Sequence, residues 1–543
     1  MSSEPVTGSP GAEHVLAVDL GTGGAKVALV STDGHIAGHE FEPVDVTLLP
    51  GGGAEQDPDR WWDAIVAATR RLLARGVAPA ESVVAACMSG QWGGTVPVDA
   101  DGRPVHPAVI WMDSRGAPYA RRLVGGGLQV PGTGLNARRL RRWLSRTAGL
   151  PSTTGKDPVG QLNWLRHERP DAYGAAAWFL DVPEYLTMRL TGQPVAGFDT
   201  AVLRWCTDNR DPAAVRYDPE LVALCGLDGE RLPRLVAPAS VVGPILPTAA
   251  AELGLGRQVQ VVAGTGDTAA AAVGAGAVLD HRAHLYVGTS AWLSCHVPYK
   301  KTDLRTNVAS LPAVVTGRYW VATVQDVAGK ALSWLVDQVL YPDDGLGPGG
   351  EVPADVLDRL NAVAAKSPPG SHGLLFTPWL NGERTPVEDE RLRGGWFNLS
   401  LTTDRAALVR SVFEGVALNA RWMLGAVDGF VKRRHPEGIG ELTFIGGGAS
   451  SALWCQVMAD VLQRPIRQAE DPVLANVRGA GLIAAVALGR LRWEDIPGRI
   501  ATRDVFRPDE AVTATYDQLF HSFREVHRRN RSLYARHNRF GWQ

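Results

Sequence analysis

The strongest constraint on the fold is a short pattern that occurs twice in the sequence, about 270 residues apart. At the first place, the apolar run Val15–Val18 leads into a Gly/Thr cluster, and a second apolar run, Val27–Val30, precedes a turn at Asp33-Gly34. At the second place, within Arg282–Pro298, two apolar runs flank a bend at Gly288-Thr289. Each place therefore predicts a β-hairpin at the start of one half of the chain. A duplicated α/β domain leaves such a repeat, and coincidence is the alternative because Gly-Thr turns are common.

The length and the order of the other elements favour the same class of fold. The chain has 543 residues, more than one hydrophobic core accommodates, which predicts two domains. Alternating strands and helices in both halves predict an α/β protein. Strands that run into glycine-rich loops are expected at 82–94 and 441–448, and helices at 57–76, 183–192 (amphipathic), 404–427, 475–489 and 521–540. Residues 1–12 are expected to form a disordered leader, and the Pro/Gly-rich stretch 341–353 a surface insertion.

Composition and charge exclude several classes of function. The net charge of −2 gives no global positive field, so neither a nucleic acid nor a membrane surface is an expected partner. The C-terminal helix is basic, but we interpret it as a solvated helix because the rest of the chain is not basic. No apolar run approaches the roughly 20 residues that span a bilayer. The five cysteines are scattered without a CxxC pair, which favours reduced thiols and a cytoplasmic enzyme over a disulfide or zinc framework.

The first hairpin contains the run "DLGTGGAK", which has the composition of a phosphate-binding loop. Gly21, Gly23 and Gly24 let backbone N–H groups approach an anion closely, and Lys26 adds a positive charge. Asp19 ends the first predicted strand, where it could hold a divalent cation through water. The run is neither a Walker A loop nor a GxGxxG turn that opens a helix. A tight hairpin with an incidental lysine is the alternative interpretation.

Two loops in the second half have a matching character. In "VGTSAW", Thr289 and Ser290 place hydroxyl groups at the bend of the second hairpin, so that two such loops facing each other could hold a triphosphate. In "FIGGGAS", Gly446–Gly448 leave a strand and enter a helix, whose first N–H groups are free to bind a ligand. A flat ligand could lie on this bare backbone. Close packing of strand against helix is the alternative.

Together, these runs resemble the FGGY carbohydrate kinases over about residues 14 to 490, in the same order. "DLGTGGAK" and "YVGTSAW" are similar to the two phosphate loops of the family, and "FIGGGASS" to its adenosine motif. "HPAVIWMDSRG", "FTPWLNGERTP" and "EGVALNAR" are similar to further family signatures. "GTGDTAAAAVGAG" is similar to the segment with the catalytic aspartate. Within the family, the pattern and the length lie nearest to the xylulokinases and related pentulose kinases.

The resemblance implies a fold and a reaction. The fold would be two ribonuclease H-like domains of the actin/hexokinase-like ATPase type, with a cleft between them. Residues 13–277 would form the sugar-binding N-terminal domain, and residues 278–543 the ATP-binding C-terminal domain with a helical extension. The reaction would be transfer of the γ-phosphoryl group of ATP, with Mg²⁺, to a sugar hydroxyl. An ATP-binding structural or sensing protein of the actin-like type is the non-enzyme alternative.

The resemblance also implies roles for individual residues. Asp267 would be the base that accepts the proton of the attacking hydroxyl, and Gly264 and Gly266 are expected to clear space for substrate in front of it. Asp19, together with Asp267, would hold Mg²⁺. The remaining cofactor contacts would be made to the phosphates by Gly21, Thr22, Gly23, Lys26, Gly288 and Thr289, and to the adenosine by Gly447, Gly448 and Ala449.

The sugar site is where this sequence departs from its family. After Gln91, many xylulokinases have Met-His and glycerol kinases have Arg-Glu, whereas this chain has Trp92 and Gly93. Thr268 stands where xylulokinases commonly have Asn. The predicted substrate residues are therefore Gln91, Trp92, Gly93, Asp113, Arg115, Asp267 and Thr268. D-xylulose, which would give D-xylulose 5-phosphate, is the favoured acceptor, and ribulose, another ketose, a sugar alcohol and glycerol are alternatives. The oligomeric state stays open, with a homodimer as one option.

Overall fold

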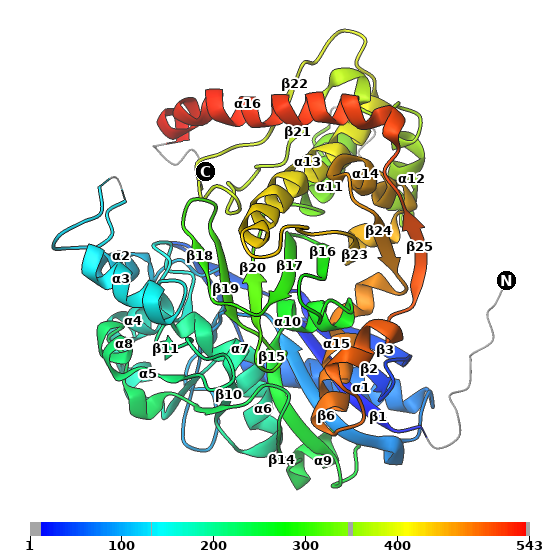
Figure 1. Cartoon of the computed structure of the whole chain (residues 1–543). Helices are drawn as coiled ribbons and strands as arrows, with labels where there is room; N and C mark the ends of the chain where they lie inside the picture. The colour runs from blue at the N-terminus through cyan, green and yellow to red at the C-terminus, as the bar shows by residue number, and fades with distance from the viewer. Residues whose placement is uncertain (1–11, 132, 346–350, 539–543) are drawn as a thin grey trace.

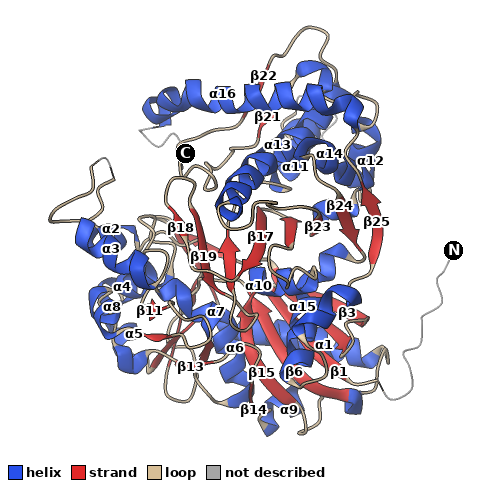
Figure 2. Cartoon of the chain, in the orientation of Figure 1, coloured by secondary structure: helices blue, strands red, loops and turns tan. Residues whose placement is uncertain are grey.

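The computed structural model describes residues 12–131, 133–345 and 351–538 of the chain, folded into two lobes that each contain one large β-sheet (Figures 1 and 2). The leader predicted at 1–12 lies, apart from Ala12, outside the described residues, as does part of the predicted insertion at 341–353. In the first sheet the strands are, from edge to edge, β14 (Val241–Pro244), β15 (Gln260–Gly266), β6 (Val83–Gly90), β1 (His14–Gly21), β2 (Gly24–Ser31) and β3 (Ile36–Pro43). In the second sheet they are β18 (Thr302–Asp303), β19 (Val308–Pro312), β20 (Tyr319–Ala322), β17 (Ala291–Val297), β16 (Ala283–Val287), β23 (Leu442–Ile445), β24 (Ile466–Ala469) and β25 (Thr502–Phe506).

The two sheets share one topology. In the first, β1 pairs antiparallel with β2 and parallel with β6, which in turn pairs parallel with β15. In the second, β16 pairs antiparallel with β17 and parallel with β23, which pairs parallel with β24. Both predicted hairpins are therefore confirmed, and the repeat seen in the sequence corresponds to a repeat of architecture.

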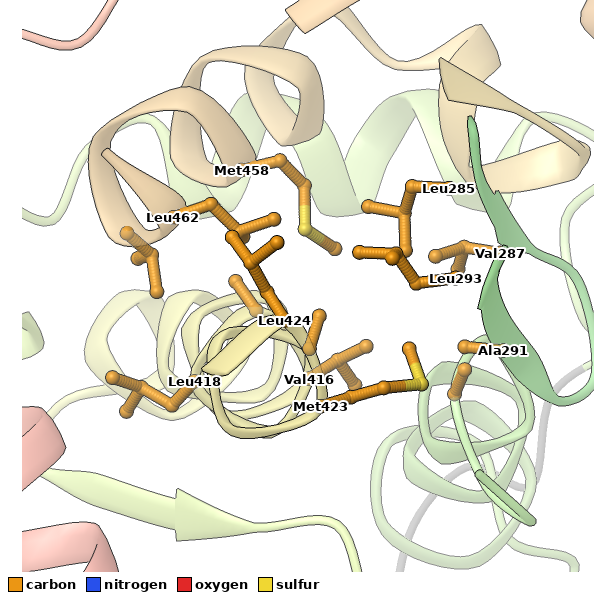
Figure 3. Packing of buried hydrophobic residues seen from close by; sticks show 14 of the residues in the cluster. Leu285, Val287, Ala291, Leu293, Val416, Leu418, Met423, Leu424, Met458 and Leu462 are labelled. Atoms are coloured by element: carbon orange, nitrogen blue, oxygen red, sulfur yellow. The ribbon is translucent and has the colours of Figure 1, made fainter. Parts of the chain in front are cut away.

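Helices cover the outer face of each sheet. On the first sheet these are α1 (Pro58–Ala74), α6 (Val182–Thr191) and α9 (Pro247–Leu253), which share a buried cluster with it. On the second sheet, α13 (Arg405–Lys432) and α14 (Ala452–Leu462) bring Val416, Met423 and Met458 against Leu285 and Leu293 of the strands (Figure 3). The predicted cap of α13 is present, since Asp404 accepts a hydrogen bond from the Ala407 N–H at 2.8 Å.

The inner faces of both sheets share a single layer of two helices. α10 (Asp267–Gly274) follows β15, and α15 (Ala475–Ala487) comes from near the end of the chain, yet both lie between the sheets (Figure 1). One buried cluster contains Val15 and Cys87 of the first sheet, Trp292 and Ile445 of the second, and apolar residues of α10 and α15. The last part of the second half therefore completes the core of the first.

Two of the predicted helices differ from the helices in the structure. Two expectations need correction: α6 is buried almost all round instead of amphipathic, because β6, β15 and α9 surround it, and the C-terminal helix α16 begins at Thr513, ahead of the expected 521. No helix in the described ranges has both the length and the apolar character that crossing a membrane requires.

The other helices are α2 (Ala117–Val124), α3 (Ala137–Arg146), α4 (Pro158–Glu168), α5 (Pro170–Ala175), α7 (Phe198–Ala201), α8 (Pro219–Leu224), α11 (Lys330–Leu335), α12 (Val356–Ala364) and α16 (Thr513–His537). The other strands are β4 (Thr47–Leu49), β5 (Gly53–Gln56), β7 (Val96–Val98), β8 (Ala108–Val109), β9 (Trp178–Leu180), β10 (Val195–Gly197), β11 (Thr207–Asp208), β12 (Arg216–Tyr217), β13 (Arg234–Val236), β21 (Leu375–Thr377) and β22 (Gly395–Phe397).

Candidate active site

Asp267 is the first residue of α10, directly after β15, so a strand end and a helix start fix its position. Its Oδ1 accepts a hydrogen bond from the Thr268 N–H at 2.7 Å. A Cβ on Gly264 would lie 2.5 Å from the Pro183 carbonyl oxygen, and one on Gly266 3.2 Å from Cγ of Trp92. These two glycines therefore make room for protein neighbours, in contrast to the expectation that they clear space for substrate.

The environment of Asp267 shifts its acidity toward neutral pH. Burial raises the pKa of its carboxyl to about 7, and the negative charges of Asp19 and, to a lesser extent, Asp181 act in the same direction. The Thr268 N–H opposes this shift because it stabilises the carboxylate. A carboxyl with a pKa near the working pH has the property that a general base requires.

Asp19 lies near Asp267, two residues before the end of β1, and receives contacts from both halves of the chain. Ser89 donates a hydrogen bond to its Oδ1 at 3.4 Å, and the side chain of Asn476 at the start of α15 is a further partner. Burial raises the pKa of Asp19, and the positive charge of Lys26, its neighbour across the β1–β2 pair, opposes this. Sequence reasoning missed Asn476, whose place at the start of a small-residue helix was the only signal.

Lys26 and Thr22 are both engaged by protein groups. The Lys26 ammonium donates to the Val473 carbonyl oxygen at 2.8 Å, which joins the first hairpin to the second half of the chain. Thr22 Oγ1 accepts a hydrogen bond from Trp111 Nε1 at 2.9 Å and lies 3.4 Å from Gln91 Oε1. Gly23, by contrast, faces open space, since nothing lies within 4 Å of where a Cβ would be.

The loop after β6 is held by a helix cap. The N–H groups of Gly93 and Gly94 donate to the carboxylate of Asp181, at 3.1 and 3.0 Å, and Asp181 also caps α6. Gly93 has φ +91°, which favours glycine at this turn. Trp92, between Gln91 and this turn, meets Trp320 of β20 edge to face, with ring centroids 5.8 Å apart. The loop with the predicted sugar residues is thus held by Asp181 and contacts the opposite lobe.

Asp113 and Arg115 form a buried pair. The Arg115 Nε donates to Asp113 Oδ2 at 2.8 Å, its second nitrogen donates to Glu55 at 2.6 Å, and its guanidinium lies 3.7 Å from the ring centroid of Trp164. The Ala54 N–H also donates to Asp113 Oδ2 at 2.8 Å. Much of the hydrogen-bonding capacity of this pair is therefore used within the protein.

In the second lobe, the bend of the second hairpin and the triple-glycine loop both lie beside Tyr286. The ring of Tyr286 stacks on Trp292 with centroids 3.7 Å apart, and a Cβ on Gly288 would lie 2.5 Å from its hydroxyl. Burial raises the pKa of Tyr286, and the charges of Asp19 and Asp267 act in the same direction, which places this hydroxyl near both carboxylates. Sequence reasoning missed Tyr286, although it lies within the second hairpin.

The bend after Tyr286 and the triple glycine have defined environments. The Thr289 carbonyl oxygen accepts from the N–H groups of Ala328 and Lys330, at 3.0 and 3.3 Å. Nothing lies within 4 Å of a Cβ on Gly447, whereas Gly448 faces Val287. The buried Ala449 accepts a hydrogen bond on its carbonyl oxygen from Gln468 at 2.6 Å. The backbone at Gly23 in one lobe and at Gly447 in the other therefore faces space that no protein atom fills.

Comparison with known proteins identifies the family. Residues 14–274 match the N-terminal domain of the FGGY family of carbohydrate kinases, and residues 283–488 match its C-terminal domain. A xylulose kinase of Streptomyces rubiginosus is 32% identical over 495 residues, which is 90% of this chain and 90% of that protein. A xylulose kinase of Staphylococcus epidermidis is 27% identical over 526 residues, or 96% and 98% of the two chains. The crystal structure of a gluconate kinase from Lactobacillus acidophilus has the same fold, with a TM-score of 0.83 at 21% identity, over 97% of this chain and 100% of that one. The chain therefore belongs to the FGGY family of carbohydrate kinases, as the sequence motifs predict.

Proposed function

We propose that the protein is a xylulose kinase, which transfers the γ-phosphoryl group of ATP to the 5-hydroxyl of D-xylulose. The observation that carries this proposal is the position of Asp267, a half-buried carboxyl with a pKa raised to about 7 that lies near Asp19 at the start of the helix layer between the lobes. The xylulose kinases similar to this chain along nearly its whole length support the choice of acceptor. We also propose that the N-terminal domain ends at residue 277 and that the C-terminal domain begins at residue 278.

In the reaction, Asp267 accepts the proton of the acceptor hydroxyl as its oxygen attacks the γ-phosphorus. The new O–P bond forms while the bond between the γ-phosphorus and the bridging oxygen breaks, and ADP leaves with that oxygen. A carboxyl with a pKa of about 7 is about half ionised at neutral pH and accepts the proton readily. Such a base typically contributes 10²–10⁴-fold to the rate.

Asp19 and Asp267 would hold Mg²⁺. Two neighbouring carboxyl groups whose pKa values are both raised by burial suit a divalent cation, which prefers oxygen ligands. When bound, the ion would neutralise the charge on the phosphates. Asn476, at the start of α15, would orient Asp19.

We assign the phosphates of ATP to the two hairpin bends and the adenosine to the triple glycine. Open backbone at Gly23 and at Gly447 supports this assignment, because a phosphate or a flat ring can approach bare backbone closely. The phosphate residues would be Gly21, Thr22, Gly23, Lys26, Gly288 and Thr289, and the adenosine residues Gly447, Gly448 and Ala449. Since Lys26 and Thr22 hold protein partners in this structure, they would exchange these partners on binding.

The sugar would be bound by Gln91, Trp92, Gly93, Asp113, Arg115 and Thr268 together with Asp267. Because the Asp113–Arg115 pair is held by protein partners, we expect it to shape the site more than to change partners. The Trp92-Gly93 pair, where pentulose kinases of the xylulose type often have Met-His, favours ribulose, another ketose or a sugar alcohol as the second candidate. A cytoplasmic location stays a prediction.

An ADP-release screen tests the proposal. The acceptors would be D-xylulose, D-ribulose, further ketoses, gluconate, sugar alcohols and glycerol, each with ATP and Mg²⁺ and with water as the background acceptor. We expect D-xylulose to give the highest kcat/KM. Release from every acceptor at the level of water would contradict the kinase assignment and favour an ATP-binding sensing protein.

A further inference from the structure

A small cavity, which is only partly enclosed, lies beside the substrate loop where the two lobes meet. Its volume is about 10 Å³, roughly the space that one water-sized group occupies. From the first lobe it is lined by Trp92, Asp199, Gly266, Thr268 and Ala269, and from the second by His296, Pro312, Ala313, Val314 and Trp320. Gly266 and Thr268 flank Asp267, so the cavity adjoins the proposed base.

The walls contain hydrogen-bond donors that have no partner. The Nε1 atoms of Trp92 and Trp320 are both buried and neither has a hydrogen-bond acceptor. An indole N–H can only donate, and a buried donor without an acceptor destabilises the protein because it loses its hydrogen bond to water. Trp320 as a whole is 6% exposed, so solvent does not satisfy it. Two residues that line the cavity therefore each have a buried N–H that lacks an acceptor.

Acceptors complete the lining. The Asp199 carboxylate is 6% exposed, and its Oδ2 accepts hydrogen bonds from Thr265 Oγ1 at 2.6 Å and from the Gly266 N–H at 3.4 Å. Burial lowers the pKa of His296 to about 4, so its ring is neutral, and Nδ1 lies 2.7 Å from the Ala277 carbonyl oxygen. Because a carbonyl only accepts, Nδ1 carries the proton of this ring, and Nε2 is an acceptor. The lining thus combines unpartnered donors with fixed acceptors.

We propose that this cavity is a specificity subsite for one hydroxyl group of the acceptor sugar, other than the hydroxyl that faces Asp267. A hydroxyl both accepts from an indole N–H and donates to a carboxylate, and it is close to the size of the cavity. Trp320 and Asp199 are then specificity-determining residues of the proposed kinase, on which this inference rests. The carboxylate of Asp199 also disfavours an acidic group in the same place, so the subsite selects neutral sugars over sugar acids.

The subsite is shared between the lobes. Trp320 belongs to β20, and Pro312 ends β19, whereas Asp199 and Gly266 belong to the first lobe. The sugar hydroxyl would therefore be recognised fully only where both lobes contact each other. Occupation of the cavity would favour the arrangement in which the second lobe lies against the sugar loop.

The test compares D-xylulose with its 1-deoxy, 3-deoxy and 4-deoxy analogues, all of which keep the 5-hydroxyl. The variant is Trp320→Phe, which removes the N–H and keeps an aromatic ring. The matched control is Trp61→Phe in α1, because Trp61 is also buried with an unpartnered Nε1 but lies in the core of the first lobe. For each protein, kcat/KM and the dissociation constant of each sugar, by calorimetry, are measured with saturating ATP or a non-hydrolysable analogue.

We expect one analogue to lose at least tenfold in kcat/KM with the wild-type protein and with Trp61→Phe, and to lose less than threefold with Trp320→Phe. Equal penalties in wild type and Trp320→Phe would overturn the subsite and leave a trapped water in its place. Asp199→Asn, which replaces the acceptor with an amide, should reduce the same penalty and provides the test if Trp320→Phe does not fold. If D-xylulose binds but is not phosphorylated, only the proposed kinase function is contradicted. If D-xylulose neither binds nor is phosphorylated, the kinase function and the subsite are both contradicted.

Discussion

Gly274 of α10 and Gly479 of α15 meet backbone to backbone where the two helices pack between the sheets. A Cβ on Gly479 would overlap the Ala270 carbonyl oxygen and would lie 2.9 Å from the Gly274 nitrogen, and a Cβ on Gly274 would overlap the Ala475 carbonyl oxygen. Since backbone cannot move aside as a side chain can, we expect Gly479→Ala to destabilise the protein by about 1–3 kcal/mol through overpacking. Chemical denaturation monitored by circular dichroism measures this loss.

Gly425→Ala is the matched control for this prediction. Gly425 is also inside a helix, α13, but it is exposed and nothing lies within 4 Å of where its Cβ would be. There, alanine should raise stability by about 0.5–1 kcal/mol, because it restricts the unfolded chain. Equal effects of the two substitutions would show that the helix contact is not tight.

Replacing the proposed base should separate chemistry from binding. Asp267→Asn keeps the shape of the side chain but cannot accept the proton, so we expect kcat to fall by about 10²–10⁴-fold. The affinity for ATP, measured by calorimetry with Mg²⁺, should change much less, because Asp19 and the glycine-rich loops remain intact and the amide oxygen of the substituted asparagine can still bind a cation. A variant with near-normal kcat would contradict the assignment of Asp267 as the base.

The pH dependence of the reaction should follow the same carboxyl. Because the pKa of Asp267 is raised to about 7, the fraction in the basic form decreases about tenfold per pH unit well below 7. We expect kcat/KM for the sugar to fall along the acidic limb with an apparent pKa near 7. An acidic limb that begins only near pH 4 would mean that Asp267 is not the titrating group.

The stability of the fold should decrease as pH rises, whereas the activity should increase. A carboxyl whose pKa is higher in the folded state than in the unfolded state stabilises the fold while it is protonated, and this contribution is lost as pH rises from about 4 to 7. The melting temperature of Asp267→Asn should therefore exceed that of wild type at pH 8, with little difference at pH 4. A difference that is the same at both pH values would count against the raised pKa.

The core of the first lobe contains an ion pair that should not tolerate the loss of one partner. Arg204 and Glu184 are 2% and 1% exposed, and their charged groups are 2.5 Å apart. Arg204→Met would leave Glu184 buried without its counter-charge, at a cost of about 3–5 kcal/mol. Arg103→Met is the control, because Arg103 and Asp101 are 74% and 72% exposed and such pairs contribute at most about 1 kcal/mol. Similar losses in both variants would contradict the prediction.

Substrates should draw the lobes together, because water must be kept from the γ-phosphate during transfer. We expect the radius of gyration, measured by small-angle X-ray scattering, to decrease when a non-hydrolysable ATP analogue and the sugar are both present. ATP analogue alone is the control. Unchanged dimensions with both ligands would count against closure.

The sequence predicts well what local rules control. The two hairpins, the cap at Asp404 and the helix that starts at Asp267 follow from apolar periodicity, turn residues and capping chemistry. It does not predict contacts between distant segments. Asn476 reaches Asp19, and Trp320 reaches Trp92, only because the helix layer and the second sheet lie against the first lobe. The hydroxyl of Thr22 likewise bonds to Trp111 because of a loop pairing that no local pattern encodes.

The shared helix layer sets an order on the formation of the molecule during its synthesis. The first sheet is complete in the chain by residue 266, but α15, which covers part of its inner face, is made more than 200 residues later. Until then, apolar residues such as Val15 and Cys87 lack part of their cover. The lobe that begins first is therefore among the last parts to finish, and the ribosome must deliver most of the second lobe before the first can reach its final stability.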